Sequence, residues 1–298
     1  MATLMQMARQ RTREAARCGA LASIETELHV LRCPRDSTFE SALEDYVVLM
    51  HLAKRPYRPD PGAARANPFL PYEPELFVAN MGEEHVLLLN KFNVFADHLL
   101  LVTRDFVEQE TLLNEADFSA IARLMAEEDG LAFFNSGPIA GASQRHKHLQ
   151  FVPLPLGPRD VPALPMLSLL RQGQLGFRYA FESLTLDWAA PSIGQALLER
   201  YRAQLSSLKL TTREASQGPE PEPPSPAFDS AQRPLPYNLL LGRDWMAVVP
   251  RCRESAGGLS LNALAYVGSF FTNQPLSLEQ MRQRGALQLL GECGCASS

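Results

Sequence analysis

"GASQRHKHLQFVPLP", residues 141–155, places two histidines and a glutamine at every second position. Side chains of a β-strand alternate between its two faces, so His146, His148 and Gln150 are predicted to project from one face. Residues 149 and 151 then point to the other side, where Lys147 is expected near the rim. Three polar groups in line cost free energy when buried, unless a ligand or a reaction uses them.

Two kinds of chemistry suit paired histidines. Zinc binding needs a third ligand, and a neutral glutamine is a poor one. The other histidines form no spaced cluster in the sequence: His29, His51, His85 and His98. Nucleophilic catalysis is therefore favoured, because an imidazole nitrogen can attack phosphorus and split one hard transfer into two easier steps. His148 would carry the nucleotidyl group, and Gln150 would hydrogen-bond a non-bridging oxygen.

The loop before this strand is made of small residues. Its backbone amides, from Gly141 to Gln144, can approach a phosphate closely, and Ser143 and Gln144 add side-chain donors. Taken alone, such a segment could simply be a turn. Its position directly before the two histidines favours a phosphate-binding loop.

The longer segment "NSGPIAGASQRHKHLQ" (135–150) resembles the signature of the diadenosine tetraphosphate phosphorylases, also called ATP adenylyltransferases. These enzymes are a transferase branch of the histidine-triad superfamily, related to galactose-1-phosphate uridylyltransferase. Three other segments are similar to the family: "NPFLPYEPELFVANM", "LLLNKFNVFADHLLLVTRDF" and "YNLLLGRDWMAVVPR". The resemblance thus spans roughly residues 50–270.

The resemblance implies that His148 is the nucleophile that carries AMP, supported by His146 and Gln150. The implied substrate contacts fall on Lys54, Asn90, Lys91, Phe92, Asn135, Gly141, Ala142, Ser143 and Gln144. In the C-terminal segment it leaves open which of Asn238, Met246 and Arg251 contact substrate. It also implies a divalent cation, Mg²⁺, held by substrate phosphates and not by a protein metal site. Arg145 departs from the family pattern, where an acidic or small residue is expected.

The implied substrates are diadenosine tetraphosphate, ATP, ADP and phosphate. Glutamine stands where related hydrolases carry a third histidine, and it offers no additional acid–base group, which favours transfer to phosphate or a nucleotide over transfer to water. Two alternatives stay open. One is adenylyl transfer involving adenosine phosphosulfate at the same site, and the other is a nucleotide sensor without turnover.

Composition limits the class of protein. In the 298 residues, 46% are hydrophobic and 20% are charged, as in a soluble globular chain. A net charge of −5 argues against nucleic-acid binding, and no apolar run reaches the roughly 20 residues that a membrane span needs. Five cysteines without a paired framework favour the cytoplasm.

The predicted fold is α+β and histidine-triad-like, with a largely antiparallel sheet, flanking helices and two related halves in one chain, which favours a monomer. The expected helices are 3–31, 37–54 (capped by Ser37 with Glu40), 114–130, 259–271 and 277–293. The expected strands are 85–92, 98–106, 131–137, 146–154 and a strand–turn–strand unit at 237–251. The expected domains are a catalytic region at 1–205, a Pro/Glu/Ser-rich linker at 206–236 and a C-terminal region at 237–298.

Overall fold

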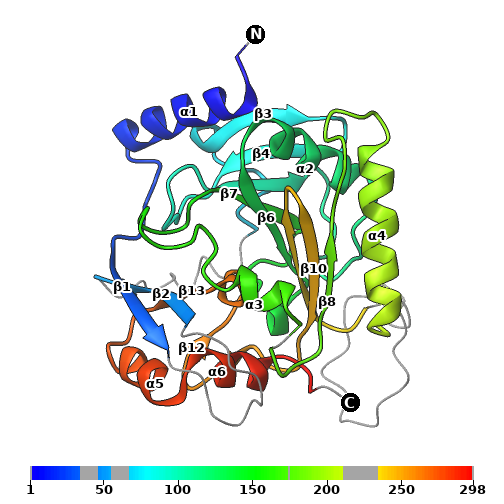
Figure 1. The fold of residues 1–298 in the computed structure, drawn as a ribbon. Helices are drawn as coiled ribbons and strands as arrows, with labels where there is room; N and C mark the ends of the chain where they lie inside the picture. Colours follow the sequence, from blue (N-terminus) through cyan, green and yellow to red (C-terminus); the bar gives the residue numbers. More distant parts are fainter. Residues whose placement is uncertain (1, 34–45, 55–66, 174, 211–233, 297–298) are drawn as a thin grey trace.

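A large antiparallel sheet forms the centre of the computed structural model, which describes residues 2–33, 46–54, 67–173, 175–210 and 234–296 (Figure 1). Its eight strands are all paired antiparallel. In spatial order they are β3 (Phe77–Met81), β4 (His85–Leu89), β5 (Leu99–Thr103), β7 (His148–Pro153), β6 (Gly130–Asn135), β9 (Tyr237–Gly242), β10 (Trp245–Pro250) and β8 (Ala180–Ser183). The predicted α+β class and antiparallel sheet are confirmed. Both predicted hairpins, β4–β5 and β9–β10, lie in this one sheet, on opposite sides of the β7–β6 pair.

Three helices cover one face of the sheet: α1 (Leu4–Cys18), α2 (Glu115–Glu127) and α4 (Ile193–Ser207). The helix α2 begins as predicted, because the Asn114 side chain accepts from the backbone N–H of Asp117 and the Asp117 side chain accepts from that of Asn114. Leu149 and Phe151 pack into the core beneath these helices. The helices therefore leave the opposite face of β7 to His148 and Gln150.

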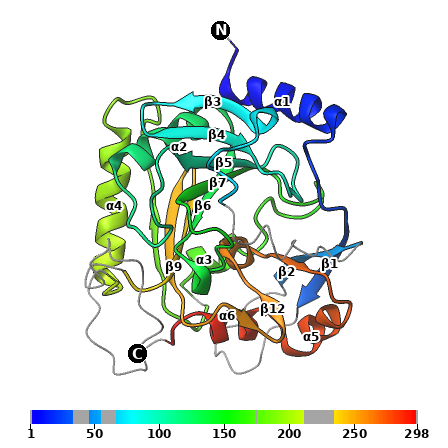
Figure 2. The same cartoon turned by 180° about the vertical axis from the view of Figure 1, so that it is seen from behind.

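A smaller layer lies against the other face (Figure 2). It consists of a three-stranded sheet, two short strands, three short helices and two short 3₁₀ segments. Their bounds are β1 (Thr26–Cys33), β2 (Tyr46–Ala53), β13 (Ser269–Thr272), β11 (Ser255–Ala256), β12 (Leu259–Ser260), α3 (Leu167–Arg171), α5 (Leu276–Arg284), α6 (Ala286–Cys293), η3 (Pro138–Ala140) and η5 (Ala263–Val267). A further 3₁₀ turn, η2 (Pro74–Leu76), lies beside α1, and its Leu76 packs into the core under the long helices.

Two predicted N-terminal helices are wrong over part of their length. The helix α1 stops at Gly19, whose φ of 78° ends it in the left-handed conformation, and residues 26–33 form a strand. Residues 46–53 form β2, which pairs with β1 along its whole length and with β13 on its other edge. An apolar run buried between two strands has no periodicity that separates it from a buried helix. The capping pair Ser37 and Glu40 lies outside the described residues.

Three glycines mark where the other predicted helices differ from the structure. The predicted helix 259–271 is wrong: residues 259–260 belong to β12, η5 covers only Ala263–Val267 before Gly268 ends it at φ 94°, and β13 follows. The predicted helix 277–293 is two helices, because Gly285 at φ 74° separates α5 from α6. Gly130 is the first residue of β6 and does not end α2, whose cap is Glu128 in extended conformation.

The expectation of unpaired cysteines is also wrong. A disulfide joins Cys252 to Cys295, with Cα atoms 5.5 Å apart and a sequence separation of 43. An antiparallel bridge between residues 251 and 294 brings the end of β10 to the C-terminal segment, and the Cys252 N–H donates to the Cys293 carbonyl at 2.8 Å. Such a long-range contact cannot be read from cysteine spacing.

Part of the predicted organisation lies beyond the described residues. Residues 211–233, which are most of the expected linker, lie outside the described residues. The predicted domain boundaries at 205 and 236 therefore stay predictions. Within the described chain, no helix has the length and apolar character needed to cross a bilayer.

Candidate active site

The histidine motif lies on the face of the sheet that the long helices leave free. His148 pairs with Val102 of β5, and Gln150 lies between Leu100 of β5 and Phe133 of β6. His146 precedes β7 and forms a bridge with residue 108. Both histidine rings contact the ring of Phe69, with centroids 5.6 and 5.4 Å away, so the two imidazoles share one face as predicted.

His148 presents one nitrogen without a hydrogen. Its Nδ1 lies 2.8 Å from the His146 carbonyl oxygen, and a carbonyl can only accept, so Nδ1 carries the proton. The lone pair is therefore on Nε2. Burial lowers the pKa of His148 to about 4, with the hydrogen bond to the His146 carbonyl opposing the shift. The ring is thus neutral at physiological pH, and its Nε2 lone pair is free of a proton, as nucleophilic attack requires.

His146 is held in the opposite tautomer. Its Nε2 lies 2.8 Å from the Thr103 carbonyl, so Nε2 donates. Its Nδ1 accepts from the Asn67 side-chain amide at 3.1 Å, and the Asn67 oxygen accepts from the Phe69 N–H at 3.0 Å. Burial lowers the pKa of His146 as well. Both nitrogens bond within the protein, so His146 supports its neighbour through its carbonyl.

Gln109, which was not predicted as a site residue, holds the backbone of His148. It is 2% exposed, and its Oε1 accepts from the His148 N–H at 2.8 Å. Its amide donates to the carbonyls of Asn135 and His148 at 2.8 and 3.1 Å. These bonds join three segments of chain behind the site. Nothing in the local pattern around residue 109 indicates this role, because its partners lie 26 and 39 residues away.

His98 is a second site residue that the sequence analysis missed, since it was treated as outside any cluster. Its Nε2 lies 2.9 Å from Gln150 Oε1, and its Nδ1 lies 3.2 Å from the Asn90 side-chain nitrogen. Burial lowers the pKa of His98 to about 4. Pairing of β5 with β7 brings His98 to the motif.

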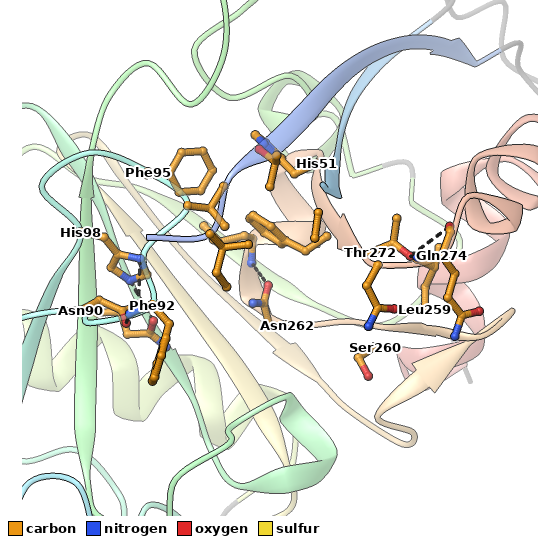
Figure 3. Close-up of a pocket in the computed structure, with 18 of the residues that line it drawn as sticks. His51, Asn90, Phe92, Phe95, His98, Leu259, Ser260, Asn262, Thr272 and Gln274 are labelled. Atoms are coloured by element: carbon orange, nitrogen blue, oxygen red, sulfur yellow. Dashed lines mark hydrogen bonds between the residues drawn. The ribbon is translucent and has the colours of Figure 1, made fainter. Parts of the chain in front are cut away.

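A pocket of about 540 Å³ adjoins Gln150 and opens between the large sheet and the small one (Figure 3). Asn90 and Phe92 line it, as does His51, whose ring stacks on Phe271 with centroids 5.0 Å apart. Its polar lining on the C-terminal side consists of Ser260, Asn262, Thr272, Asn273 and Gln274. The volume lies in the usual range for small-molecule sites. The pocket's C-terminal wall is formed by residues 258–274, a segment to which the sequence analysis assigned no site residue.

The loop from residue 137 to 144 is supported from beneath. Gly141 has φ 91°, and a Cβ there would lie 2.7 Å from the Leu261 carbonyl oxygen, so glycine is required. Ala142 donates its N–H to the carbonyl of residue 137 at 3.0 Å. Ser143 is exposed and Gln144 is half-buried, so both side chains are accessible to a ligand.

Three predicted contacts brace this loop from inside the protein. The Asn238 amide donates to Asn135 Oδ1 and to the Ala140 carbonyl, both at 2.8 Å. Arg251 donates to Asn238 Oδ1 at 2.7 Å and is 2% exposed. These side chains bond to protein groups, so they position the loop. The predicted contacts through Asn135, Asn238 and Arg251 side chains stay predictions.

The possible substrate contact through Met246 is wrong. Met246 is fully buried on the helix-covered face of β10, within the core that also holds Leu149, so it cannot reach a ligand on the histidine face. Successive side chains in a strand point to opposite faces, and the Met246 side chain points to the face away from the histidines.

The two candidate lysines lie at the surface. Lys91 is ion-paired with Glu73 at 2.6 Å, and Lys54 lies 3.8 Å from Glu25. Lys54 directly follows Ala53, which lines the pocket. Both stay predicted phosphate contacts.

The expected position of Lys147 near the rim of the site is also wrong, because its side chain is buried. It is 2% exposed, and its ammonium group lies 2.5 Å from Asp117 Oδ2 and 3.1 Å from the Leu112 carbonyl. The other oxygen of Asp117 bonds His85 Nε2 at 2.8 Å. This buried network, defined here as His85–Asp117–Lys147, anchors the start of β7 to α2.

Comparison with known proteins identifies the family. The model of the "Ap4A phosphorylase N-terminal domain" matches residues 1–172, more than half of the chain. The chain belongs to the Ap4A phosphorylase family. The remainder, residues 173–296, matches the "ATP adenylyltransferase C-terminal domain". The resemblance and the predicted class of enzyme, an ATP adenylyltransferase or Ap4A phosphorylase, are confirmed.

Individual relatives agree with this family. Diadenosine 5',5'''-P1,P4-tetraphosphate phosphorylase 2 of Saccharomyces cerevisiae is 28% identical over 261 residues, which cover 76% of each chain. Protein APA1 of the same yeast is 26% identical over 228 residues, covering 70% of this chain and 68% of its own. The crystal structure of yeast Ap4A phosphorylase Apa2 matches with a TM-score of 0.75 and 24% identity, over 100% of this chain and 96% of that one, and so shows the same fold.

Proposed function

We propose that this Ap4A phosphorylase family member cleaves diadenosine tetraphosphate with phosphate, giving ADP and ATP through an AMP–histidine intermediate. His148 Nε2 attacks the α-phosphorus, a P–N bond forms, and the P–O bond to the β-phosphate breaks as ATP leaves. An oxygen of phosphate then attacks the same phosphorus, the P–N bond breaks, and ADP is released. The same steps run backwards from ATP and ADP.

The tautomer of His148 is the observation that carries this proposal. Its Nδ1–H donates to the His146 carbonyl, so the nucleophilic lone pair faces away from that contact. When Nε2 bonds to phosphorus the ring becomes cationic, and the carbonyl oxygen stabilises this charge through the Nδ1–H hydrogen bond. The low pKa of His148 keeps the ring neutral beforehand.

The pocket beside Gln150 suits the nucleoside that remains attached to the reacting phosphorus. Aromatic rings of His51, Phe95 and Phe271 offer stacking surfaces, and amide side chains at Asn90 and Asn262 offer hydrogen bonds. Gln150, two residues from the nucleophile on the same strand face, lies between the pocket and the reacting phosphorus.

A divalent cation, Mg²⁺, fits this site as a companion of the substrate. The amide side chains around the pocket are weak ligands for Mg²⁺, which binds phosphate oxygens and keeps several waters. It would neutralise charge on the polyphosphate, and the residues of this chain would bind the nucleoside and orient the phosphorus.

Phosphorus NMR of products from diadenosine tetraphosphate, with and without phosphate, tests the function. We expect equal ADP and ATP that depend on added phosphate, and none from His148→Ala. Products from adenosine phosphosulfate at a higher kcat/KM would favour that substrate instead. Tight binding of the dinucleotide with no product would favour a sensor. Acid-labile labelling of His148→Ala by labelled dinucleotide would refute the assigned nucleophile.

We propose further that the enzyme acts as a monomer in the cytoplasm. The adenine nucleotides of the reaction are intracellular metabolites, and a single chain supplies every strand of the large sheet. Sedimentation velocity tests the first claim, since a dimer at micromolar concentration would contradict it. Thiol titration of protein purified from a reducing cytoplasm reports whether residues 252 and 295 are paired there.

A further inference from the structure

A chain of hydrogen bonds runs from a backbone amide to the glutamine of the motif. The Phe92 N–H donates to Asn90 Oδ1 at 3.1 Å. A backbone N–H can only donate, so this contact identifies the oxygen end of the Asn90 amide. The nitrogen end then donates to His98 Nδ1 at 3.2 Å. Because Nδ1 accepts, the His98 proton is on Nε2, which donates to Gln150 Oε1 at 2.9 Å.

We propose that His98 is a positioning residue that fixes the side-chain amide of Gln150 with its NH₂ group toward the reacting phosphate. This inference rests on the proposed function. The Gln150 oxygen is held by His98, no described residue accepts from the Gln150 nitrogen, and Gln150 lines the pocket. Two N–H donors are thereby left for a non-bridging phosphate oxygen.

The fixed direction matters because an amide has two unlike ends of the same shape. Turned the other way, Gln150 would point an oxygen at a phosphate oxygen and repel it. A preorganised donor stabilises a developing charge without reorganisation during the reaction. His98 is 8% exposed and its ring lies 5.9 Å from that of Phe133, so it is held in place.

A second chain of hydrogen bonds with the same pattern lies in the site. Asn67 accepts from the N–H two residues ahead, at Phe69, and donates to His146 Nδ1, whose Nε2 then donates to the Thr103 carbonyl. In both cases an Asn-x-Phe turn selects a histidine tautomer. The turn at Asn67 fixes His146, beside His148, and the turn at Asn90 fixes His98, beside Gln150.

A double-mutant cycle tests the inference. His98→Phe keeps an aromatic ring against Phe133 and removes the donor, and Gln150→Leu removes the amide. We expect each single variant to lower kcat for phosphorolysis about 10- to 100-fold with KM for the dinucleotide within threefold. The double variant should be no slower than Gln150→Leu, because His98 acts only through Gln150. His98→Gln, which places an N–H near the lost donor, should recover part of kcat.

Multiplicative losses in the double variant, or equal losses in His98→Phe and His98→Gln, would overturn the proposal. Nitrogen-15 NMR of the wild-type imidazoles gives an independent reading that does not depend on a variant's folding. We expect a protonated Nε2 and bare Nδ1 at His98, and the reverse tautomer would overturn the proposal. Wild-type protein without turnover would refute the proposed function, while the NMR reading would still decide the direction of these hydrogen bonds.

Discussion

The buried network His85–Asp117–Lys147 should determine much of the stability of the strand that carries the histidine motif. Lys147→Met keeps the length of the side chain and removes its charge, which leaves Asp117 as a buried carboxylate short of one partner. Removing one member of a buried ion pair costs about 3–5 kcal/mol. The 2.5 Å contact and 2% exposure place this pair in that class. We therefore expect a loss of about 3–5 kcal/mol in the free energy of unfolding.

Arg145→Met is the matched control, two positions away. Arg145 also pairs with a carboxylate, that of Glu108, but its side chain is 72% exposed, so the expected loss is below about 1 kcal/mol. Urea unfolding followed by circular dichroism, with unchanged m-values, measures both variants. If Lys147→Met lost no more stability than Arg145→Met, the reasoning about burial would be refuted.

The same network predicts a dependence on pH. Burial alone would raise the pKa of Asp117, but the hydrogen bond from His85 and the charge of Lys147 outweigh burial and lower it. A lowered carboxyl pKa stabilises the fold above the unfolded pKa of about 3.9, and this contribution is lost as the pH falls below that value. The difference between wild type and Lys147→Met should therefore shrink below about pH 4. A difference that stayed constant down to pH 3 would assign the loss to packing alone.

Three further outcomes are expected. The rate of covalent labelling should stay constant as the pH falls and decline only near pH 4, because burial lowers the pKa of His148 to about 4, and a decline centred at 6.5 would contradict this. Gly141→Ala should lower kcat/KM about tenfold, since its Cβ would meet the Leu261 carbonyl at 2.7 Å, whereas Gly173→Ala, also at positive φ but in open space, should leave kcat/KM unchanged. Met246→Leu should cost less than about 1.5 kcal/mol and leave KM within twofold, and a tenfold rise in KM would return Met246 to the site.

Local patterns predicted the elements whose signals lie within a few residues. The capped helix after Asn114, the two hairpins and the common face of His146 and His148 follow from periodicity and turn residues. The strand β2 carries the apolar pattern of a buried helix, because its burial comes from two partners distant in the sequence. Only tertiary pairing separates these cases.

The site was predictable only where the motif is contiguous. His98 and Gln109 are 52 and 39 residues from the groups that they contact, and no spacing rule connects them. Met246 was placed wrongly because membership of a similar segment does not determine which face of the strand a side chain takes. Lys147 shows the same limit, since its partner Asp117 lies on a helix that the sequence could place but not dock.

The strand order has a consequence for dividing this protein. The two family segments meet along the β6–β9 seam inside one continuous sheet, with β8, from the second segment, at its far edge. Expressed apart, each segment would present a bare, apolar interior strand to solvent, and such edges invite aggregation. Produced together as separate polypeptides, the two segments should pair again along β6 and β9 and restore the sheet that carries His148.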